Sequence, residues 1–325
     1  MKRLVVAVIG GGANCEHAVS LASAASVASA LDPGLHDVRS LTIGQDGVWS
    51  DASGPLGSSA AESLAAALVR IAGCDVVLPI VHGPRGEDGT LAALCELAGV
   101  PYAGSGVRGG AIAMDKWATK LVADALGIGT ARGVLLTARD ARNIGHHSPV
   151  VVKPVAAGSS HGVTLVHEAA ELDPAIDAAL ALDDRVLVEE LVVGREVDIA
   201  VLERADGSRL VGPALEIIVA PDSVFDLATK YDGSADFRLP ADLEEAEHKG
   251  LVDAALALFD ALGCAGVARF DFFVTAEGLV LNEVNTMPGL TAESQVPRMF
   301  AAIGLPYADL LAELVQAALG TSRRR

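Results

Sequence analysis

The chain has 325 residues, of which 51% are hydrophobic and 20% charged, a composition that is typical of a folded protein and excludes a disordered one. The formal net charge of −18 argues against nucleic acid and anionic membranes as partners, because like charges repel. No apolar run reaches transmembrane length, and the first one, Leu4 to Ile9, leads into glycines and not into a signal-peptide cleavage site. We therefore expect a cytoplasmic protein that has no membrane partner.

The first hundred residues alternate between strand and helix patterns. We predict strands over 4–9, 37–43 and 75–79, and helices over 16–31 and 63–71. This βαβ order implies a parallel sheet. The turn-rich segment 101–106 ends the pattern, so we predict an N-terminal α/β domain over residues 1–105.

The rest of the chain predicts two further units with antiparallel strands. The first, over residues 106–196, contains a helix over 111–125, strands over 149–153, 162–166 and 185–190, and a helix that starts at Pro174. The second, over residues 197–325, contains long strands, a helix over 241–262 and a C-terminal helix after Pro306. We expect the active groups to lie between these closely packed domains.

A β-hairpin near the end of the chain is the most informative feature. A three-residue loop that ends at Gly278 would close it and would place Asp271 opposite Glu283 and Arg269 opposite Asn285. Period-2 alternation then puts all four side chains on one face. Carboxylate and amide oxygens are the ligands that Mg²⁺ prefers, and an arginine beside them suits a phosphate. A salt-bridged hairpin at a sheet edge fits the same residues equally well.

Three other polar motifs each allow a functional and a structural reading. Glu16 lies at the start of a predicted helix, where it either caps the helix or binds a substrate ammonium group. His82 follows a strand, in the position where open α/β sheets bind ligands, or it is a satisfied structural histidine. Lys153 precedes a Gly-Ser-Ser-x-Gly turn whose backbone N–H groups, Ser160 among them, suit phosphates; an ordinary hairpin turn is the alternative.

Two segments carry weaker signals. The strand edge over 188–198 contains Glu189 and Glu196, which suit adenine and ribose or belong to a charged surface turn. The segment over 225–233 contains Lys230 and Tyr231, and it reads either as a mobile lid or as a surface loop.

Taken together, the motifs resemble the D-alanine–D-alanine ligase family of the ATP-grasp fold, from Leu4 to about Leu314. The signatures, in chain order, are GG-x-N-x-EHxVS, HGPRGEDG, PYAGSGV with AMDK, VVKP with GSSHGV, EE with GRE, KYDG, and RFDFF with NEVNTMPG. The resemblance implies a three-domain α/β protein with an N-terminal parallel α/β domain and central and C-terminal α+β subdomains. It also implies that ATP activates one D-alanine as D-alanyl phosphate, which a second D-alanine attacks, giving the dipeptide for peptidoglycan synthesis.

The resemblance implies a role for each matching residue. ATP phosphates are expected at Lys116 and Lys153, and adenine and ribose are expected at Glu189 and Glu196. Lys230 is expected to belong to the lid. Two Mg²⁺ ions, replaceable by Mn²⁺, are expected at Asp271, Glu283 and Asn285. The first D-alanine is expected at Glu16, Val19 and His82, the oxyanion at Arg269 and the backbone of Gly289, a lid-closing triad at Glu16, Ser159 and Tyr231, and the second substrate at Ser294. The resemblance further implies a homodimer.

A few positions depart from the family pattern. Gln295 and Glu293 flank Ser294 with polar groups, so Gln295 is a candidate determinant of the second substrate, and D-serine or another D-amino acid stays open as the acceptor. Tyr231 follows the pattern instead: relatives that form depsipeptides lack this Lys-Tyr pair, so the resemblance implies an amine and not D-lactate as the nucleophile. A non-catalytic nucleotide-binding relative is disfavoured, since the expected metal ligands and the arginine are all present.

Overall fold

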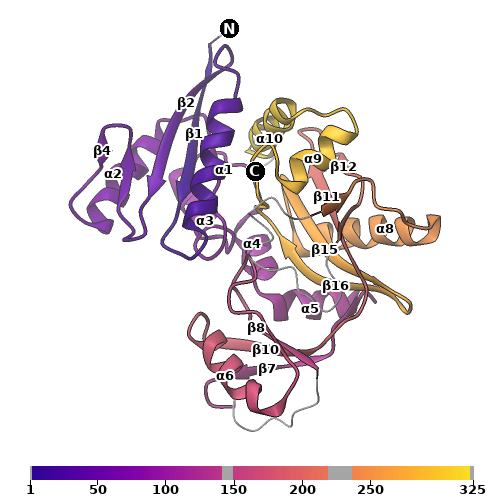
Figure 1. Cartoon of the computed structure of the whole chain (residues 1–325). Helices are drawn as coiled ribbons and strands as arrows, with labels where there is room; N and C mark the ends of the chain where they lie inside the picture. Colours follow the sequence, from indigo (N-terminus) through magenta and orange to yellow (C-terminus); the bar gives the residue numbers. More distant parts are fainter. Residues whose placement is uncertain (1, 141–148, 219–235, 323–325) are drawn as a thin grey trace.

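The computed structural model describes residues 2–140, 149–218 and 236–322, which form three sheets with helices packed around them (Figure 1). No single helix within these ranges is long and apolar enough to cross a membrane.

The N-terminal sheet is mainly parallel, as the βαβ pattern predicted. Its strand order is β4-β3-β2-β1-β5, with β1 (Leu4–Gly11) in parallel register with both β2 (His36–Ile43) and β5 (Val76–Pro79). The strands β3 (Trp49–Asp51) and β4 (Gly54–Pro55) extend it in antiparallel fashion, and the first three helices are α1 (His17–Ala30), α2 (Ala60–Ala72) and α3 (Thr90–Ala98).

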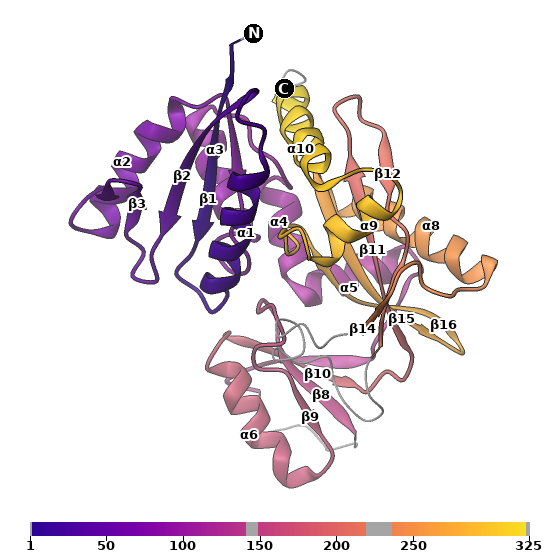
Figure 2. The ribbon, with the colours of Figure 1, turned by 45° about the horizontal axis from the view of Figure 1, so that its top comes forward.

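The central strand β1 is buried on both faces, which is why it reads as a continuous apolar run. Val6 and Val8 share a core with α1 and with α10 (Tyr307–Ser322), whereas Ala7 and Ile9 share a core with α2 and α3. Figure 2 shows α10 beside α1, so the end of the chain covers the sheet with which the chain begins.

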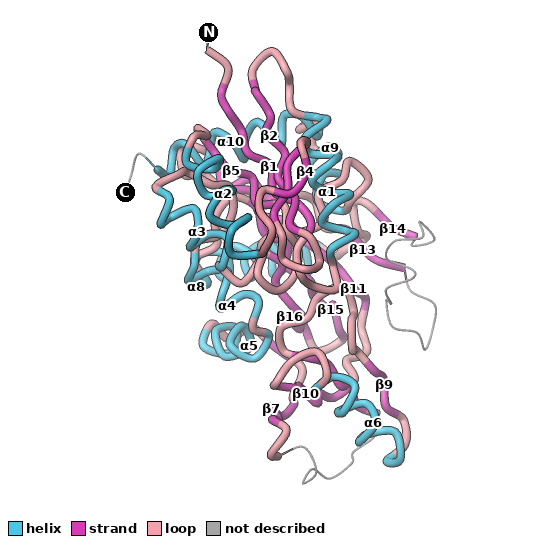
Figure 3. Tube along the Cα trace, turned by 90° about the vertical axis from the view of Figure 1, so that its left-hand side faces the viewer, coloured by secondary structure: helices cyan, strands magenta, loops and turns pink. Residues whose placement is uncertain are grey.

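The central sheet is antiparallel, as predicted, with the order β7-β10-β8-β9. Its strands are β7 (Gly133–Thr137), β10 (Arg185–Glu190), β8 (Val150–Pro154) and β9 (Thr164–Val166). The helix α6 (Ala169–Leu180) packs on one face against Val152, Val166 and Val186. Alternation along β8 leaves Lys153 on the opposite face. Figure 3 shows this unit at the far end of the molecule from the N-terminus.

The third sheet is the largest, with the order β14-β13-β11-β15-β16-β6 and β12 paired to β11. Its strands are β6 (Gly129–Thr130), β11 (Arg195–Glu203), β12 (Arg209–Val211), β13 (Leu215–Ile218), β14 (Asp236–Arg238), β15 (Val267–Thr275) and β16 (Gly278–Asn285). One face packs on α8 (Glu245–Leu262), and the other packs on α9 (Gln295–Ala302) and α10. The strand β6 belongs to this third sheet, although its residues lie within the range predicted for the central domain. The predicted domain boundaries stay predictions.

Several predicted helices differ from the structure in their bounds, among them the one predicted over 63–71, which begins at Ala60. The single helix over 111–125 is two helices, α4 (Val107–Met114) and α5 (Lys116–Ala125), because the Asp115 side chain between them accepts from the backbone N–H of Ala118 at 2.9 Å and starts a new helix. The helix predicted from Pro174 begins at Ala169, and the helix predicted from Ala241 begins at Glu245. In both cases a capping box, Glu168 with Glu171 and Glu244 with Glu247, fixes the start.

The hairpin of β15 and β16 has the predicted pairs, Asp271 with Glu283 and Arg269 with Asn285, but not the predicted loop. Thr275 pairs with Gly278, so the loop has two residues, and a β-bulge between Asp271 and Phe272 restores the register by leaving Asn282 as the extra residue. Leu281 and Val284 both enter the core under α8. The consecutive residues Asn282 and Glu283 therefore both face away from that core.

Candidate active site

One face of the hairpin carries a charged cluster. The Arg269 guanidinium donates to both carboxylate oxygens of Asp271, from Nε at 2.6 Å and from Nη2 at 2.7 Å. Asn285 donates its amide N–H to Asp271 Oδ2 at 3.0 Å. Asp271 is only 5% exposed. The carboxylates raise the pKa of Arg269 despite its burial, so its charge is permanent.

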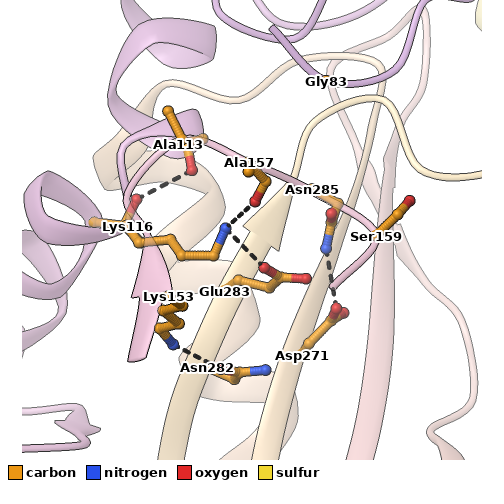
Figure 4. Close-up of polar contacts among 12 residues, drawn as sticks. Gly83, Ala113, Lys116, Lys153, Ala157, Ser159, Asp271, Asn282, Glu283 and Asn285 are labelled. Atoms are coloured by element: carbon orange, nitrogen blue, oxygen red, sulfur yellow. Dashed lines mark hydrogen bonds and ion pairs between the residues drawn. The ribbon is translucent and has the colours of Figure 1, made fainter. Parts of the chain in front are cut away.

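Lys116 connects the start of α5 to the hairpin (Figure 4). Its Nζ lies 3.1 Å from Glu283 Oε2 and donates to the backbone carbonyl of Ala157 at 2.7 Å. Burial acts to lower the pKa of Lys116, but the Glu283 carboxylate outweighs it and the pKa is raised. Lys116, Glu283 and Asn285 line a cavity of about 20 Å³, the size of one water molecule. The larger cavity, about 260 Å³ beside Tyr102 and Gly266, contains none of the predicted site residues.

A second charged cluster lies on the polar face of the central sheet. Lys153 Nζ lies 2.7 Å from Glu189 Oε2 and 3.2 Å from Asn282 Oδ1, so the bulge residue links the two sheets. Lys120 on α5 pairs with the other oxygen of Glu189. The two lysines outweigh burial and lower the pKa of Glu189. We did not predict Lys120, although its position four residues after Lys116 places both on one helix face.

The hairpin has the donor set of a magnesium site. Asp271, Glu283 and Asn285 provide two carboxylates and one amide oxygen on one face, and Mg²⁺ is usually held by one or two carboxylates together with substrate phosphates. No group of three or more His, Cys, Asp or Glu side chains in the described ranges is placed to hold a metal by itself. The two carboxylates and the amide of the hairpin fit a metal ion that is also bound by phosphates.

Glu16 is closely surrounded by Gly83 of the N-terminal unit and by Gly158 and Ser159 of the central unit. It precedes α1 without capping it, and its Oε1 accepts a hydrogen bond from Ser159, which the motifs had placed in one triad with it. A Cβ atom at Gly83 or Gly158 would lie 2.3 Å or 2.6 Å from Glu16 Oε2, so a side chain at either position would displace the Glu16 carboxylate. Within the described residues Glu16 Oε2 has no hydrogen-bond partner, although Glu16 is 5% exposed. A buried carboxylate oxygen in this state suits an incoming ammonium group.

His82 joins the N-terminal loop to the C-terminal unit. Its Nδ1 lies 2.7 Å from the carbonyl of Met287 and its Nε2 lies 2.9 Å from the hydroxyl of Ser23. Burial lowers the pKa of His82, so the ring is neutral, donates from Nδ1 and accepts at Nε2. Both nitrogens are thus engaged, and a contact with the first D-alanine stays a prediction.

Glu87, which we did not predict, adds to this contact between the N-terminal and C-terminal units. We call the contact around His82 and Glu87 the joint. Its two carboxylate oxygens accept from the backbone N–H groups of Gly83 at 2.7 Å and Met287 at 3.0 Å. Burial, and then the charge of Glu16, raises the pKa of Glu87 to about 8. The sequence signal that could have indicated Glu87 is its place in the GEDG part of the HGPRGEDG motif. Asn14 adds to the joint by donating to the carbonyls of His82 and Pro84.

The remaining predicted residues are spread over several elements. Ser294 Oγ accepts from the backbone N–H of Thr291 at 3.1 Å and lies against Gly289. Ser160 has a left-handed backbone, with φ at 57°, in the loop that precedes β9. Val19 on α1, Glu196 on β11 and Gln295 on α9 are half-buried. Lys230 and Tyr231 lie outside the described residues.

The fold and the site together define an ATP-grasp enzyme. The central antiparallel sheet places Lys153 against the C-terminal sheet, which carries the carboxylates and the arginine, and α5 adds Lys116. Glu16 of the N-terminal unit is hydrogen-bonded to Ser159 of the central unit.

Comparison with known proteins identifies the family. The model of the D-Ala–D-Ala ligase N-terminus matches residues 5–105, and that of the C-terminus matches residues 139–316. A D-alanine–D-alanine ligase of Nocardia farcinica is 42% identical over 99% of both chains, and one of Mycobacterium avium is 40% identical over 98% of this chain and 97% of its own. The chain therefore belongs to the D-alanine–D-alanine ligase family and is an enzyme of this type.

Solved structures agree with this assignment. The VanG D-Ala:D-Ser ligase from Enterococcus faecalis matches with a TM-score of 0.81 and 32% identity, over 98% of this chain and all of its own. The D-alanine–D-alanine ligase from Bacillus anthracis, complexed with ATP, matches with a TM-score of 0.79 and 26% identity over 99% of each chain.

Proposed function

We propose that the protein joins two D-alanines at the expense of ATP, through D-alanyl phosphate, and releases D-alanyl-D-alanine, ADP and phosphate. The observation that carries this proposal is the contact of Lys116 and Lys153 with the hairpin residues Glu283 and Asn282. This contact supports the proposal because it brings the lysines proposed for the phosphates next to the hairpin that carries the proposed metal ligands. Full-length relatives at 40–42% identity carry the name of this activity.

In this proposal the nucleotide replaces the ion-pair partners that the charged site residues now provide for one another. Lys116 and Lys153 bind its phosphates with the backbone of the Ser160 loop, and Glu189 and Glu196 bind adenine and ribose. Asp271, Glu283 and Asn285 would hold two Mg²⁺ ions, or Mn²⁺ in their place, which neutralise charge on the transferred phosphoryl group. The chain's own contribution is positioning and electrostatic stabilisation.

The amino acid sites follow from the remaining groups. Glu16, with Val19 and His82 beside it, binds the ammonium group of the first D-alanine through the buried Oε2. Arg269 and the backbone N–H of Gly289 stabilise the oxyanion that forms when the second amine attacks the acyl phosphate. Ser294 and Gln295 hold the second substrate. Lys230 and Tyr231 complete a lid with Ser159, which matters because water would hydrolyse an acyl phosphate.

A direct assay tests the activity. Purified protein, ATP, Mg²⁺ and D-alanine should release phosphate and form D-alanyl-D-alanine in equal amounts, with L-alanine as the control substrate. ATP binding without dipeptide formation from any D-amino acid would contradict the proposal and would favour a non-catalytic nucleotide-binding relative.

A different acceptor is the second candidate function. Glu293 is exposed and Gln295 is half-buried on either side of Ser294, and the VanG D-Ala:D-Ser ligase has the same fold. Competition among D-alanine, D-serine and D-lactate as the second substrate separates the two candidates. We expect D-alanine to be preferred and D-lactate to fail, and a preference for D-serine would replace the first candidate by the second.

The quaternary state and the location complete the proposal. We expect a cytoplasmic homodimer built from the domains 1–105, 106–196 and 197–325. Sedimentation of the purified protein across a range of concentrations tests the dimer, and a monomer throughout that range would contradict it.

A further inference from the structure

Asp198 is a buried carboxylate next to the site to which the proposed reaction assigns no role. It lies on β11 directly opposite Asp271 on β15, so both side chains are on the face that carries Arg269. Asp198 is 1% exposed, and its Oδ2 lies 3.5 Å from Arg269 Nε. The next residues on the same face, Ala200 and Leu202, belong to the apolar core. A charge at this depth is costly unless a cation compensates it, and Arg269 is the cation that faces it.

Arg269 therefore lies between two carboxylates at different distances. Asp271 is the nearer one, held by two hydrogen bonds of 2.6 Å and 2.7 Å, and Asp198 is the more distant one. Asp271 is also the carboxylate that the proposed function gives to a metal ion. Oxygens that bind a metal would be less available to a guanidinium, so Arg269 would lose its nearer partner when the metal is bound.

The third carboxylate of the cluster, that of Glu283, does not replace Asp271 as the partner of Arg269. Glu283 lies 3.1 Å from Lys116 and is itself one of the proposed metal ligands. Asn285 carries no charge. Asp198 lies beside Arg269 and takes no part in the proposed metal site.

We propose that Asp198 is a positioning residue that holds the Arg269 guanidinium when Asp271 binds the metal–nucleotide. This inference rests on the proposed function. It has two consequences. Because Asp198 offers Arg269 a second partner, Arg269 releases Asp271 more easily and the metal binds more tightly. Asp198 also keeps Arg269 on the sheet face where the oxyanion forms, so the chemical step is faster.

The test is Asp198→Asn, which keeps the side-chain size and removes the charge. Binding of Mn²⁺ in the presence of a non-hydrolysable ATP analogue, followed by the electron paramagnetic resonance of free Mn²⁺, gives a readout that does not depend on turnover. We expect about 10-fold weaker Mn²⁺ binding and about 10-fold lower kcat, as is typical when a residue that supports a metal ligand is lost. The KM for D-alanine should change by less than about two-fold, because Glu16 and its surroundings are untouched.

Glu203→Gln is the matched control. Glu203 lies on the same strand and pairs with Arg209 at 3.0 Å, far along β11 from the hairpin cluster, so both readouts should keep their wild-type values. If Asp198→Asn does not fold, Asp198→Ser is measured in its place.

The outcomes separate this inference from the proposed function. If the wild-type protein binds no Mn²⁺ with the nucleotide analogue, the metal site itself is wrong. If the wild type binds Mn²⁺ and the Asp198 variant binds it equally well, only the role of Asp198 is overturned. A variant that loses kcat and thermal stability together, with unchanged Mn²⁺ affinity, also overturns it, because a purely structural carboxylate would behave in that way.

Discussion

The hairpin of β15 and β16 and the joint around His82 both bury ionisable groups, but they compensate them in opposite ways. In the hairpin each carboxylate faces a cation, Asp271 with Arg269 and Glu283 with Lys116, so the groups remain charged. In the joint the partners are backbone groups and a hydroxyl, and burial favours the neutral forms of His82 and Glu87. A charged group that is paired with another charged group can exchange that partner for a metal ion or a nucleotide phosphate. Neutral groups hydrogen-bonded to backbone hold two units together.

The largest expected effect comes from removing charge at the hairpin. Asp271→Asn or Glu283→Gln keeps the shape of the site but removes a proposed metal ligand, and we expect kcat to fall by about 10³-fold or more, the upper end for a single electrostatic group. Coupled measurement of phosphate release and dipeptide formation checks this.

Asp253→Asn is the control for that experiment. Asp253 forms an exposed ion pair with Lys249 on α8, and such surface pairs contribute little to stability. Its activity should equal that of the wild type. Wild-type activity in either hairpin variant would remove the metal assignment.

Arg269→Ala comes next. If the guanidinium stabilises the oxyanion, kcat should fall by about 10²-fold. The KM for ATP should change much less, because Lys116 and Lys153 still bind the phosphates. A variant that loses ATP affinity and keeps its kcat would show that Arg269 binds the nucleotide instead, and would end its role in the chemical step.

Glu87 tests the other half of the comparison through pH. Its pKa rises on folding from the ordinary 4.5 to about 8, so between these values the folded protein holds a proton that the unfolded chain releases. The stabilising contribution is fully present below pH 4.5 and is lost as the pH rises through 8. Relative to Glu87→Gln, which does not titrate, the wild type should lose roughly 1.4 kcal/mol of stability per pH unit in this window.

Urea unfolding of both proteins between pH 4.5 and 9 measures this difference. A difference that does not change with pH would show that Glu87 is already ionised in the folded protein, and the joint would then resemble the hairpin.

The sequence predicted the hairpin better than the joint, and the reason is the range of the interactions. The pairs Asp271–Glu283 and Arg269–Asn285 follow from period-2 alternation within one short segment. Even there two errors cancelled, since the loop is one residue shorter and a bulge adds one residue. The bulge brings Asn282 to Lys153, a contact between strands more than a hundred residues apart that no local pattern indicates.

The βαβ pattern similarly predicted the parallel sheet, and two strands joined by a glycine- and serine-rich loop predicted the antiparallel central unit. Glu87, Lys120 and Asp198 were missed because their partners, Met287, Glu189 and Arg269, come from distant elements. Helix starts were misplaced where a side chain at the cap, such as Asp115, outweighed the apolar pattern.

The smallest expected effect separates structure from catalysis at the joint. Ser23→Ala removes the hydroxyl that His82 Nε2 and the backbone N–H of Leu290 both contact. A buried group that loses its hydrogen-bond partner costs about 1–3 kcal/mol, so the melting temperature should fall by a few degrees. The kcat should stay within about two-fold, because the hydroxyl takes no part in the proposed chemistry. If kcat instead falls in parallel with an increased KM for D-alanine while the melting temperature is unchanged, the Ser23 hydroxyl supports the binding of the first substrate that we propose for His82, and Ser23 would have to be counted as part of the active site.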